Sequence, residues 1–365
     1  MIGSTQPLGS SATIGGHLHV VESLDDLRED WIALAPQSEN IFSTWEWAST
    51  WWRHYGNGAK PLVVGCSEPR GGDIVALLPL YVWSVRPVRI ARFIGHGPAD
   101  QLGPVCAPAA RAVAADALRA AAARSKLDLV LAELLPGDGG WPALLRRKPM
   151  LVEASPAISL ADGWQAYLAR RSRNLRQQIH RRERQLHHRH SVRFRLVVEP
   201  DRLDEDLTQL FELHTARWGQ QSAFLRFESF HREFAAVALD RGWLRLWLLE
   251  LDERPAAAWY GFRFAGVESY YQAGRDLSLA EESVGFVLLA HTIRAAAEDG
   301  VKEYRLLRGA ESFKFRFAET NPELYSFALA SGIAGRAAQA AATVGIRSAT
   351  ARTALRRIRS SRGSG

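Results

Sequence analysis

The chain has 365 residues, which is too long for one ordinary hydrophobic core and fits two domains of about 100 to 200 residues each. Its content of 47% hydrophobic and 23% charged residues is typical of a globular protein and excludes a disordered chain. The formal net charge of +7 comes mainly from arginine and favours anionic partners, with nucleic acid, a membrane surface and coenzyme A all allowed.

The cysteines and the apolar stretches argue against several kinds of site and location. Cys66 and Cys106 are the only cysteines, and neither has a second ligand at metal-binding spacing, so we expect neither a disulfide framework nor a metal. Residues 1–16 lack the basic start and apolar core of an export signal. The longest apolar stretches are about half as long as a membrane-spanning helix. We therefore expect a cytoplasmic protein with a flexible start over residues 1–16.

The first half alternates strands with helices. We expect an edge strand at residues 17–21 and then a helix that opens on Ser43-Thr-Trp-Glu46, a capping box in which Glu46 reaches back to the N–H of Ser43. This helix runs to about Tyr55. Its four tryptophans are Trp45, Trp47, Trp51 and Trp52. Rings at helical spacing are usually core anchors, and the alternative, contact with a substrate, has Trp45 as its candidate.

An antiparallel meander and two further strands complete the first half. Gly71-Gly72-Asp73 is the turn between the first two strands of the meander, and Gly95–Pro104 is a glycine-rich loop. In that loop Asp100 is either a polar contact to a substrate or a turn-stabilising residue. The expected strands are residues 61–66, 74–83, 88–94, 127–135 and 151–159, and the expected helices are residues 109–125 and 141–147.

The second half repeats this order without obvious sequence identity, so we place the boundary near residue 160. The expected helices are residues 162–190, 203–218, 227–241 and 284–299, and the expected strands are residues 192–199, 243–251, 256–264, 268–273, 302–307 and 324–329. We expect the last strand to close the second unit. From Ser331 the chain is rich in alanine and arginine, and Arg347–Arg362 contains no acid, which predicts a basic helical tail that frays.

One predicted helix carries much of the positive charge. Residues 170–190 contain eight arginines and four histidines against one acid, Glu183. The apolar stripe of this helix consists of Leu168, Leu175, Ile179 and Leu186. Because one stripe packs, the rest stays cationic. That face is either a solvated surface or a binding site for the phosphates of RNA, of anionic lipid or of coenzyme A, with Arg173 and Arg176 as candidate ligands.

A strand end and a helix start form a second candidate site. Tyr270-Tyr-Gln-Ala-Gly274 ends a strand, and Glu281-Glu-Ser-Val-Gly285 leads into a helix whose first turn is small or apolar. Such a helix start presents backbone N–H groups and the positive end of the helix dipole to a pyrophosphate. The candidate ligand-binding residues here are Gln272, Gly274, Ser283, Val284 and Gly285.

The stretch Tyr304–Phe317 is the most informative part of the sequence. It places four cations, one carboxylate and a glycine directly after a short apolar run. This pattern indicates a site for a polyanionic ligand, with Arg308, Lys314 and Arg316 as candidate contacts.

The same stretch resembles the last sheet motif of the FemAB/CelD-like branch of the GNAT acyltransferases. The residues that it shares with the motif are Leu306, Leu307, Arg308, Gly309, Glu311, Lys314 and Arg316. Phe313 stands where the family usually has Tyr, and Arg305 and Ala310 stand where acids are usual. Further segments similar to the family are Phe42-Ser-Thr-Trp-Glu-Trp47, Leu77-Leu-Pro-Leu80 and Arg173-Asn-Leu-Arg176.

The resemblance implies an α/β protein with two tandem GNAT-like domains, each with a mixed central sheet flanked by helices. Residues 17–160 would be a degenerate domain, residues 161–330 the domain that binds the acyl donor, and residues 331–365 the basic tail. The implied co-substrate is an acyl-CoA, acetyl-CoA foremost, with its thioester along the strand at Tyr270. The implied acceptor is an amine or hydroxyl of a small molecule, a sugar or a cell-envelope precursor, held between the domains.

Acyl transfer needs a base, an oxyanion donor and precise alignment of the reactants. Glu311 is our preferred base, because it is a single carboxylate among cations and the family has an acid there. An ion pair with Arg308 or Lys314 is the alternative role of Glu311, and these cations would weaken it as a base. Tyr271 and His291 are the other catalytic candidates, and backbone N–H groups of the Tyr270 strand could stabilise the oxyanion.

Two other functions stay open at this point. An aminoacyl-tRNA-dependent transferase of the FemAB type would use the basic helix to bind RNA. A non-enzymatic binding module would hold nucleic acid or a membrane surface with the basic helix and the tail.

Overall fold

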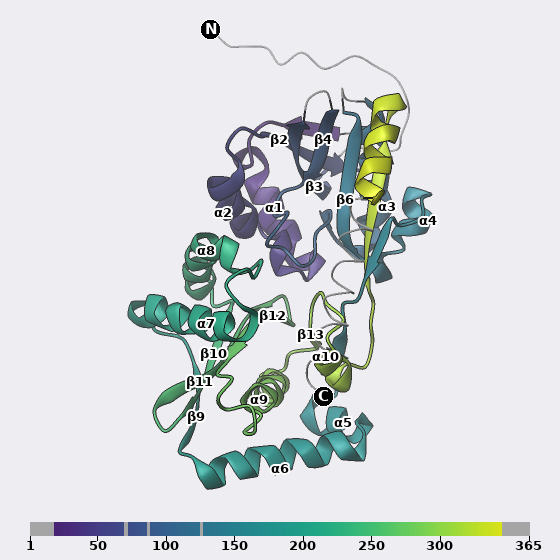
Figure 1. The fold of residues 1–365 in the computed structure, drawn as a ribbon. Helices are drawn as coiled ribbons and strands as arrows, with labels where there is room; N and C mark the ends of the chain where they lie inside the picture. The colour runs from purple at the N-terminus through teal and green to yellow at the C-terminus, as the bar shows by residue number, and fades with distance from the viewer. Residues whose placement is uncertain (1–17, 69–71, 86–87, 125–126, 345–365) are drawn as a thin grey trace.

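The computed structural model describes residues 18–68, 72–85, 88–124 and 127–344. The chain forms two mixed sheets flanked by helices, one in each half of the molecule (Figure 1). This arrangement confirms the predicted fold class. Residues 332–344 are helical, whereas the predicted helix at Arg347–Arg362 lies outside the described residues, as do residues 1–16 and Gly71 of the predicted turn.

The first sheet is antiparallel except where β4 pairs with β6 in parallel. Its path is β1 (Leu18–Val21), β2 (Lys60–Ser67), β3 (Ile74–Val85), β4 (Val88–Phe93), β6 (Leu129–Pro136), β14 (Leu324–Ala330) and β7 (Leu151–Glu153), with β5 (Val105–Cys106) on β3. The helices of this half are α1 (Arg28–Leu34), α2 (Trp45–Tyr55), α3 (Arg111–Arg124) and α4 (Trp141–Leu145).

The second sheet is antiparallel except where β12 pairs with β13 in parallel. Its path is β8 (Ala157–Ser159), β13 (Glu303–Arg305), β12 (Val267–Arg275), β11 (Arg254–Phe264), β10 (Leu244–Leu251) and β9 (Val192–Leu196). The helices of this half are α5 (Gly163–Arg170), α6 (Arg173–Arg189), α7 (Leu203–Trp218), α8 (Glu228–Asp240), α9 (Val284–Glu298) and α10 (Ser312–Phe317).

The two halves exchange strands, which corrects two predictions. The predicted strand 151–159 is two strands, because β7 joins the first sheet and β8 joins the second. The predicted last strand of the second unit, β14, instead lies between β6 and β7 in the first sheet, where Leu324, Phe327 and Leu329 are buried. The division into two units near residue 160 stays a proposal. In this division β8 of the first unit belongs to the second sheet, and β14 of the second unit belongs to the first sheet.

The two chain crossings between the sheets run side by side and are bonded to each other. Leu306 N–H donates to the carbonyl of Pro156 at 2.8 Å, and Gly309 N–H donates to the carbonyl of Ala154 at 2.9 Å. The stretch 306–311 is therefore fixed to the other crossing between the two sheets.

Two helix starts differ from the predictions. Helix α2 is capped by Thr44, whose Oγ1 accepts from the N–H of Trp47 at 3.2 Å, and not by Ser43. The predicted capping box is wrong because Glu46 pairs with Arg241 at 2.9 Å. The single helix predicted over residues 162–190 breaks before Ser172, whose side chain caps α6 by accepting from the N–H of Leu175.

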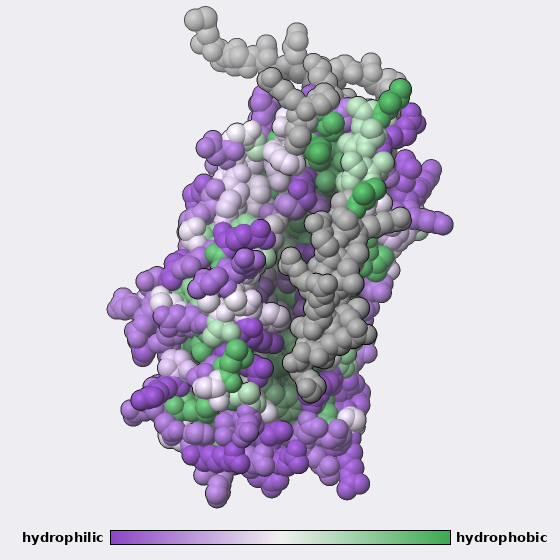
Figure 2. Space-filling view, viewed as in Figure 1, coloured by the Kyte–Doolittle hydropathy of each residue, from purple (hydrophilic) through white to green (hydrophobic). Residues whose placement is uncertain are grey.

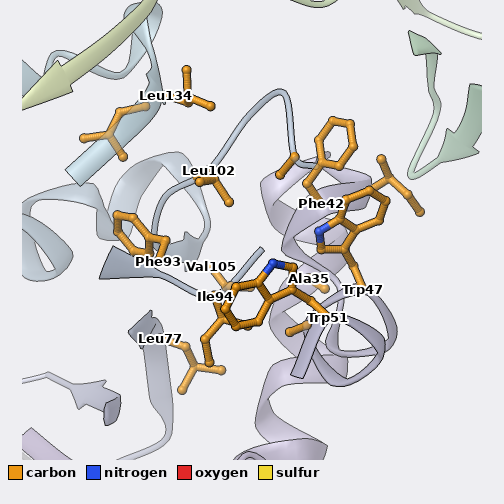
Figure 3. Close-up of a cluster of buried hydrophobic side chains, with 14 of the residues drawn as sticks. Ala35, Phe42, Trp47, Trp51, Leu77, Phe93, Ile94, Leu102, Val105 and Leu134 are labelled. Atoms are coloured by element: carbon orange, nitrogen blue, oxygen red, sulfur yellow. The ribbon is translucent and has the colours of Figure 1, made fainter. Parts of the chain in front are cut away.

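A continuous hydrophobic core joins the two halves. Trp47 of α2 is fully buried and packs edge-to-face against Phe230 and Phe234 of α8, with ring centroids 4.8 and 4.6 Å apart. Figure 3 shows the part of this core around Trp47, Phe42 and Trp51. These tryptophans are the core anchors that the sequence pattern favours. Because one core serves both halves, their surfaces keep a fixed relation to each other.

Candidate active site

The site starts from an open edge of strand β12. Strand β13 pairs with β12 only over Val267–Ser269, and β12 then continues to Arg275. Within the described parts of the chain, the edge of β12 from Tyr270 onward therefore faces no strand on that side. The pairing with β11 also shifts register, so that Tyr271 is an extra residue between Tyr270 and Gln272. Such a β-bulge changes the direction in which the neighbouring side chains point.

A narrow cavity of about 260 Å³, which we call the slot, lies between this open edge and the start of α9. Its polar lining includes three guanidinium groups, from Arg217, Arg275 and Arg316. Gly274 lies on its wall, and a Cβ there would lie 2.3 Å from the backbone nitrogen of His214. Only glycine therefore allows β12 to pass this close to α7.

The start of α9 contributes backbone groups to the slot. Gly285, in the first turn, lines it, and the N-cap Ser283 has a left-handed backbone with φ 56° and makes no side-chain cap. A helix N-terminus without a side-chain cap suits an anion. Of the two preceding acids, Glu282 is engaged elsewhere, because it pairs with Arg189 of α6 at 2.9 Å.

A larger cavity of about 1250 Å³, which we call the cleft, lies between the two halves. It is bounded by the Gly95–Pro104 loop, the ends of β6 and β7, the end of α7 and the loop after it, strand β12 and the stretch 308–314. The cleft carries both signs of charge. Its acids are Asp100, Glu133, Glu153 and Glu311, and its cations are Arg217, Arg308 and Lys314.

The slot and the cleft meet at a shared wall. The residues that line both cavities are Arg217, Tyr270, Ala273 and Phe313. A molecule bound along β12 in the slot is thus placed to present one end to a second molecule in the cleft.

The stretch 307–314 is held together by the buried ammonium of Lys314. Its Nζ donates to the carbonyl of Arg308 at 2.6 Å and lies 3.2 Å from Oε2 of Glu311. Burial lowers the pKa of Lys314, an effect that the nearby Glu311 carboxylate opposes. The Glu311 carboxylate also folds over Gly309, where a Cβ would lie 2.2 Å from Oε2. Gly309 has φ 127°, which other residues rarely adopt.

Asp100 lines the cleft from the first half of the chain. Burial raises the pKa of its carboxyl to about 6, against the opposing influence of the Arg308 and Lys314 cations. A carboxyl group with a pKa near 6 changes protonation close to neutral pH, as a catalytic or substrate-binding acid often does.

Tyr271 connects the two halves of the site. Its hydroxyl donates to the carbonyl of Pro98 and lies 3.4 Å from Nε2 of His231. Burial raises the pKa of Tyr271 well above its usual value, so the phenol stays neutral. Tyr271 therefore holds the Gly95–Pro104 loop against β12.

The structure brings together most of the residues predicted for the site. Those that line the cleft are Asp100, Tyr271, Gln272, Arg308, Glu311 and Lys314, and those that line the slot are Gly274, Gly285 and Arg316. Ser283 is the N-cap residue of α9 but makes no side-chain cap, and the side chain of Val284 is buried in the core.

Four predicted residues lie away from both cavities. The ring of His291 stacks on Phe194 with centroids 3.9 Å apart, and burial lowers its pKa to about 4. Trp45 packs under the guanidinium of Arg28 at 4.2 Å. Arg173 is exposed on α6, and Arg176 donates to the carbonyl of Ala169. These four residues lie away from β12 because they belong to other layers of the fold.

Sequence reasoning missed the contribution of α7 and the loop after it. His214 and Arg217 line the cleft, as do Trp218 and Ser222. The available signal was the polar pair at positions i and i+3 of a helix, which places His214 and Arg217 on one face. Arg275 of the slot was missed too, although it directly follows Gly274 at the end of the strand.

The described residues contain no group of three or more His, Cys, Asp or Glu side chains that could hold a metal ion. Over the same residues, no helix is long and apolar enough to cross a bilayer.

Part of the chain matches a known protein family. Residues 173–315 match the family model described as acetyltransferase (GNAT) domain. This match over part of the chain supports an acyltransferase of the GNAT type.

Two solved structures are similar to this chain in fold. The crystal structure of FemX covers 83% of this chain and 96% of its own, with 11% identity and a TM-score of 0.62. The C-terminal domain of a putative lysylphosphatidylglycerol synthetase from Agrobacterium fabrum covers 88% of this chain and 98% of its own, with 13% identity and a TM-score of 0.55. A comparison with curated protein sequences found no match.

Proposed function

We propose that this protein transfers an acyl group, acetyl foremost, from an acyl-CoA in the slot to an amine or hydroxyl of an acceptor in the cleft. The observation that carries the proposal is the wall of four residues that the slot and the cleft share. A donor in the slot and an acceptor in the cleft would lie side by side along β12, as transfer between two bound molecules requires.

The donor is held by charge and by backbone groups. Arg217, Arg275 and Arg316 line the slot together with the first turn of α9, and this combination suits the phosphates of coenzyme A. The thioester carbonyl then lies along the open edge of β12, where backbone N–H groups can stabilise the oxyanion.

The acceptor is handled by the carboxylates of the cleft. An acceptor ammonium loses two protons in forming an amide, of which one ends on the coenzyme A thiol and one leaves to solvent. We assign Glu311 the role of base and Asp100 the contact to the acceptor ammonium. Because the cleft holds acids and cations together, we propose an acceptor with both an amine and an anionic group, as in a small metabolite, a sugar or a cell-envelope precursor.

The donor proposal is tested by the binding of acetyl-CoA to the full chain in a calorimeter. We expect Arg275→Ala to weaken binding by about tenfold, which corresponds to one charge-assisted contact. Arg202→Ala is the matched control, since Arg202 is an exposed arginine at the start of α7 that lines neither cavity. Equal affinity of all three proteins would contradict the placement of the donor in the slot.

A second donor class is favoured by one specific feature. Helix α6 exposes Arg173, His180, Arg181, Arg184, His187, His188 and Arg189. Figure 2 shows hydrophilic side chains along the lower end of the molecule, where Figure 1 places α6. Arg182 of the same helix donates to the carbonyl of Glu281, just before α9. The cationic face thus adjoins the donor site, and an aminoacyl-tRNA is the alternative donor.

A further inference from the structure

A serine and a histidine that no motif singled out are hydrogen-bonded in the cleft. Ser222 Oγ lies 2.7 Å from Nε2 of His214, and Nδ1 of the same ring lies 3.2 Å from the carbonyl oxygen of Ala273. His214 comes from α7, Ser222 from the loop after α7 and Ala273 from β12. All three line the cleft.

The partners determine which ring nitrogen carries the proton. A backbone carbonyl can only accept, so Nδ1 of His214 must be the protonated nitrogen that donates to Ala273. Burial lowers the pKa of His214 to about 4, and the cation of Arg217 acts in the same direction, so the ring is neutral near pH 7. Nε2 is then an acceptor, and the proton in the 2.7 Å bond belongs to Ser222.

This arrangement is that of an activated nucleophile. A hydroxyl donates to an imidazole, and the imidazole is oriented by a third group, here the carbonyl of Ala273. The amide N–H of Phe224 donates to the same Oγ at 3.3 Å and would stabilise negative charge on it.

Ser222 and His214 lie close to the point where an acyl group would pass from the slot to the cleft. Ala273 lines both the slot and the cleft, and the indole of Trp218 also donates to its carbonyl at 3.3 Å. Ser222 is half-buried and open to the cleft. The hydroxyl therefore lies on the acceptor side of the point where the two cavities join.

We propose that Ser222 is a nucleophile that accepts the acyl group from the donor and passes it to the acceptor, with His214 as its base. The inference rests on the proposed function for the identity of the donor. It adds a covalent intermediate and two residues to that function.

The two half-reactions balance. In the first, Ser222 Oγ bonds to the thioester carbon while its proton moves to Nε2 of His214. The C–S bond then breaks, and the thiolate takes the proton from His214 to leave as coenzyme A thiol. In the second, the acceptor nitrogen bonds to the ester carbon, its proton moves to His214, and the Ser222 oxygen leaves and recovers that proton.

The test needs no acceptor. Full-length protein is incubated with acetyl-CoA and isotopically labelled coenzyme A, and the label that enters acetyl-CoA is measured. The same samples are quenched in acid, and peptide mass spectrometry maps the acetyl group. We expect exchange and an acetyl group on Ser222 in the wild type. Ser278→Ala is the control, because the Ser278 hydroxyl also bonds to a neighbour, Asp276, but lines neither cavity.

The variants separate a nucleophile from a structural contact. Ser222→Ala should abolish exchange and labelling, and His214→Gln should slow exchange by at least about a hundredfold. Ser222→Cys should restore a covalent acetyl group as a thioester. Binding of acetyl-CoA, measured by calorimetry, should stay within about twofold in all three variants. A hydroxyl that only holds the loop would leave exchange absent from the wild type as well.

The outcomes also distinguish this inference from the proposed function. If the wild type binds acetyl-CoA but shows neither exchange nor a label on Ser222, the nucleophile is refuted and direct transfer stands. If the wild type does not bind acetyl-CoA, the proposed donor fails, and p-nitrophenyl acetate then tests the serine alone. Acetylation of Ser222 by that ester, lost in His214→Gln, supports the activated hydroxyl, whereas its absence overturns it.

Discussion

Replacement of Glu311 by glutamine separates its two possible roles. Glu311→Gln keeps the size of the side chain and its fold over Gly309, but it removes the negative charge 3.2 Å from the Lys314 ammonium. If Glu311 takes the proton of the acceptor, turnover should fall by about 10² to 10⁴, the usual contribution of a general base.

The stability of the variant follows from the same contacts. Lys314 is buried, so its ammonium loses a charged partner that water cannot replace. Its 2.6 Å bond to the Arg308 carbonyl remains, and the glutamine oxygen can still accept from Nζ. The free energy of unfolding should therefore fall by about 1–3 kcal/mol, less than the ~3–5 kcal/mol for breaking a fully buried ion pair.

The assay follows the release of coenzyme A thiol from acetyl-CoA, with chemical denaturation on the same samples. Glu319→Gln is the matched control, because Glu319 pairs with Arg170 and Arg171 at 2.8 and 2.9 Å but lines neither cavity. That control should lose stability and keep its turnover. Unchanged turnover in Glu311→Gln, together with lowered stability, would refute the base and leave Glu311 as a structural ion pair.

Two further predictions concern the donor class and the pH dependence. Replacing Arg173, Arg176 and Arg181 by alanine should weaken acetyl-CoA binding only modestly and leave tRNA unbound. Salt-sensitive binding of tRNA by the wild type that is lost in the triple variant would instead favour the aminoacyl-tRNA donor. In that case the slope of log affinity against log salt concentration should fall by roughly one unit per lost phosphate contact. The pKa of Asp100 is about 6 in the folded state and lower in the unfolded state, so between about pH 4 and 6 the folded state binds one more proton than the unfolded state. The stabilisation that comes from protonated Asp100 is therefore lost as the pH rises from about 4 to 6. Asp100→Asn should therefore flatten that part of the stability profile against pH and remove an acid limb near pH 6 from the turnover profile, whereas profiles identical to those of the wild type would contradict the shifted pKa.

Local sequence patterns predicted the elements of this protein well. Alternating or continuous apolar runs gave β10, β11 and β12, and the spacing of Leu175, Ile179 and Leu186 gave the buried stripe of α6. These predictions succeed because burial imposes a period of two on strands and of 3.6 on helices, whatever the rest of the fold does. The cations and the glycine of the 308–316 stretch were likewise visible as one cluster.

Local patterns could not decide where a strand pairs. Residues 151–159 and 324–330 are apolar enough to join any open sheet edge. Only the geometry of the two crossings decides that β14 pairs in the first sheet and β8 in the second. The cap of α2 shows the same limit, because Glu46 has a partner, Arg241, almost 200 residues away.

The sequence by itself determined the class of fold, the basic helix and the motif around Glu311, because each depends on residues that are close together in the sequence. Only the tertiary structure decided that Asp100, Tyr271 and Lys314 share one cleft, that His291 lies outside it, and that Ser222 and His214 meet beside Ala273. The physical reason is that a site depends on distances between side chains from different elements, and these distances are set by packing across the shared core and by strand pairing, which no local pattern encodes.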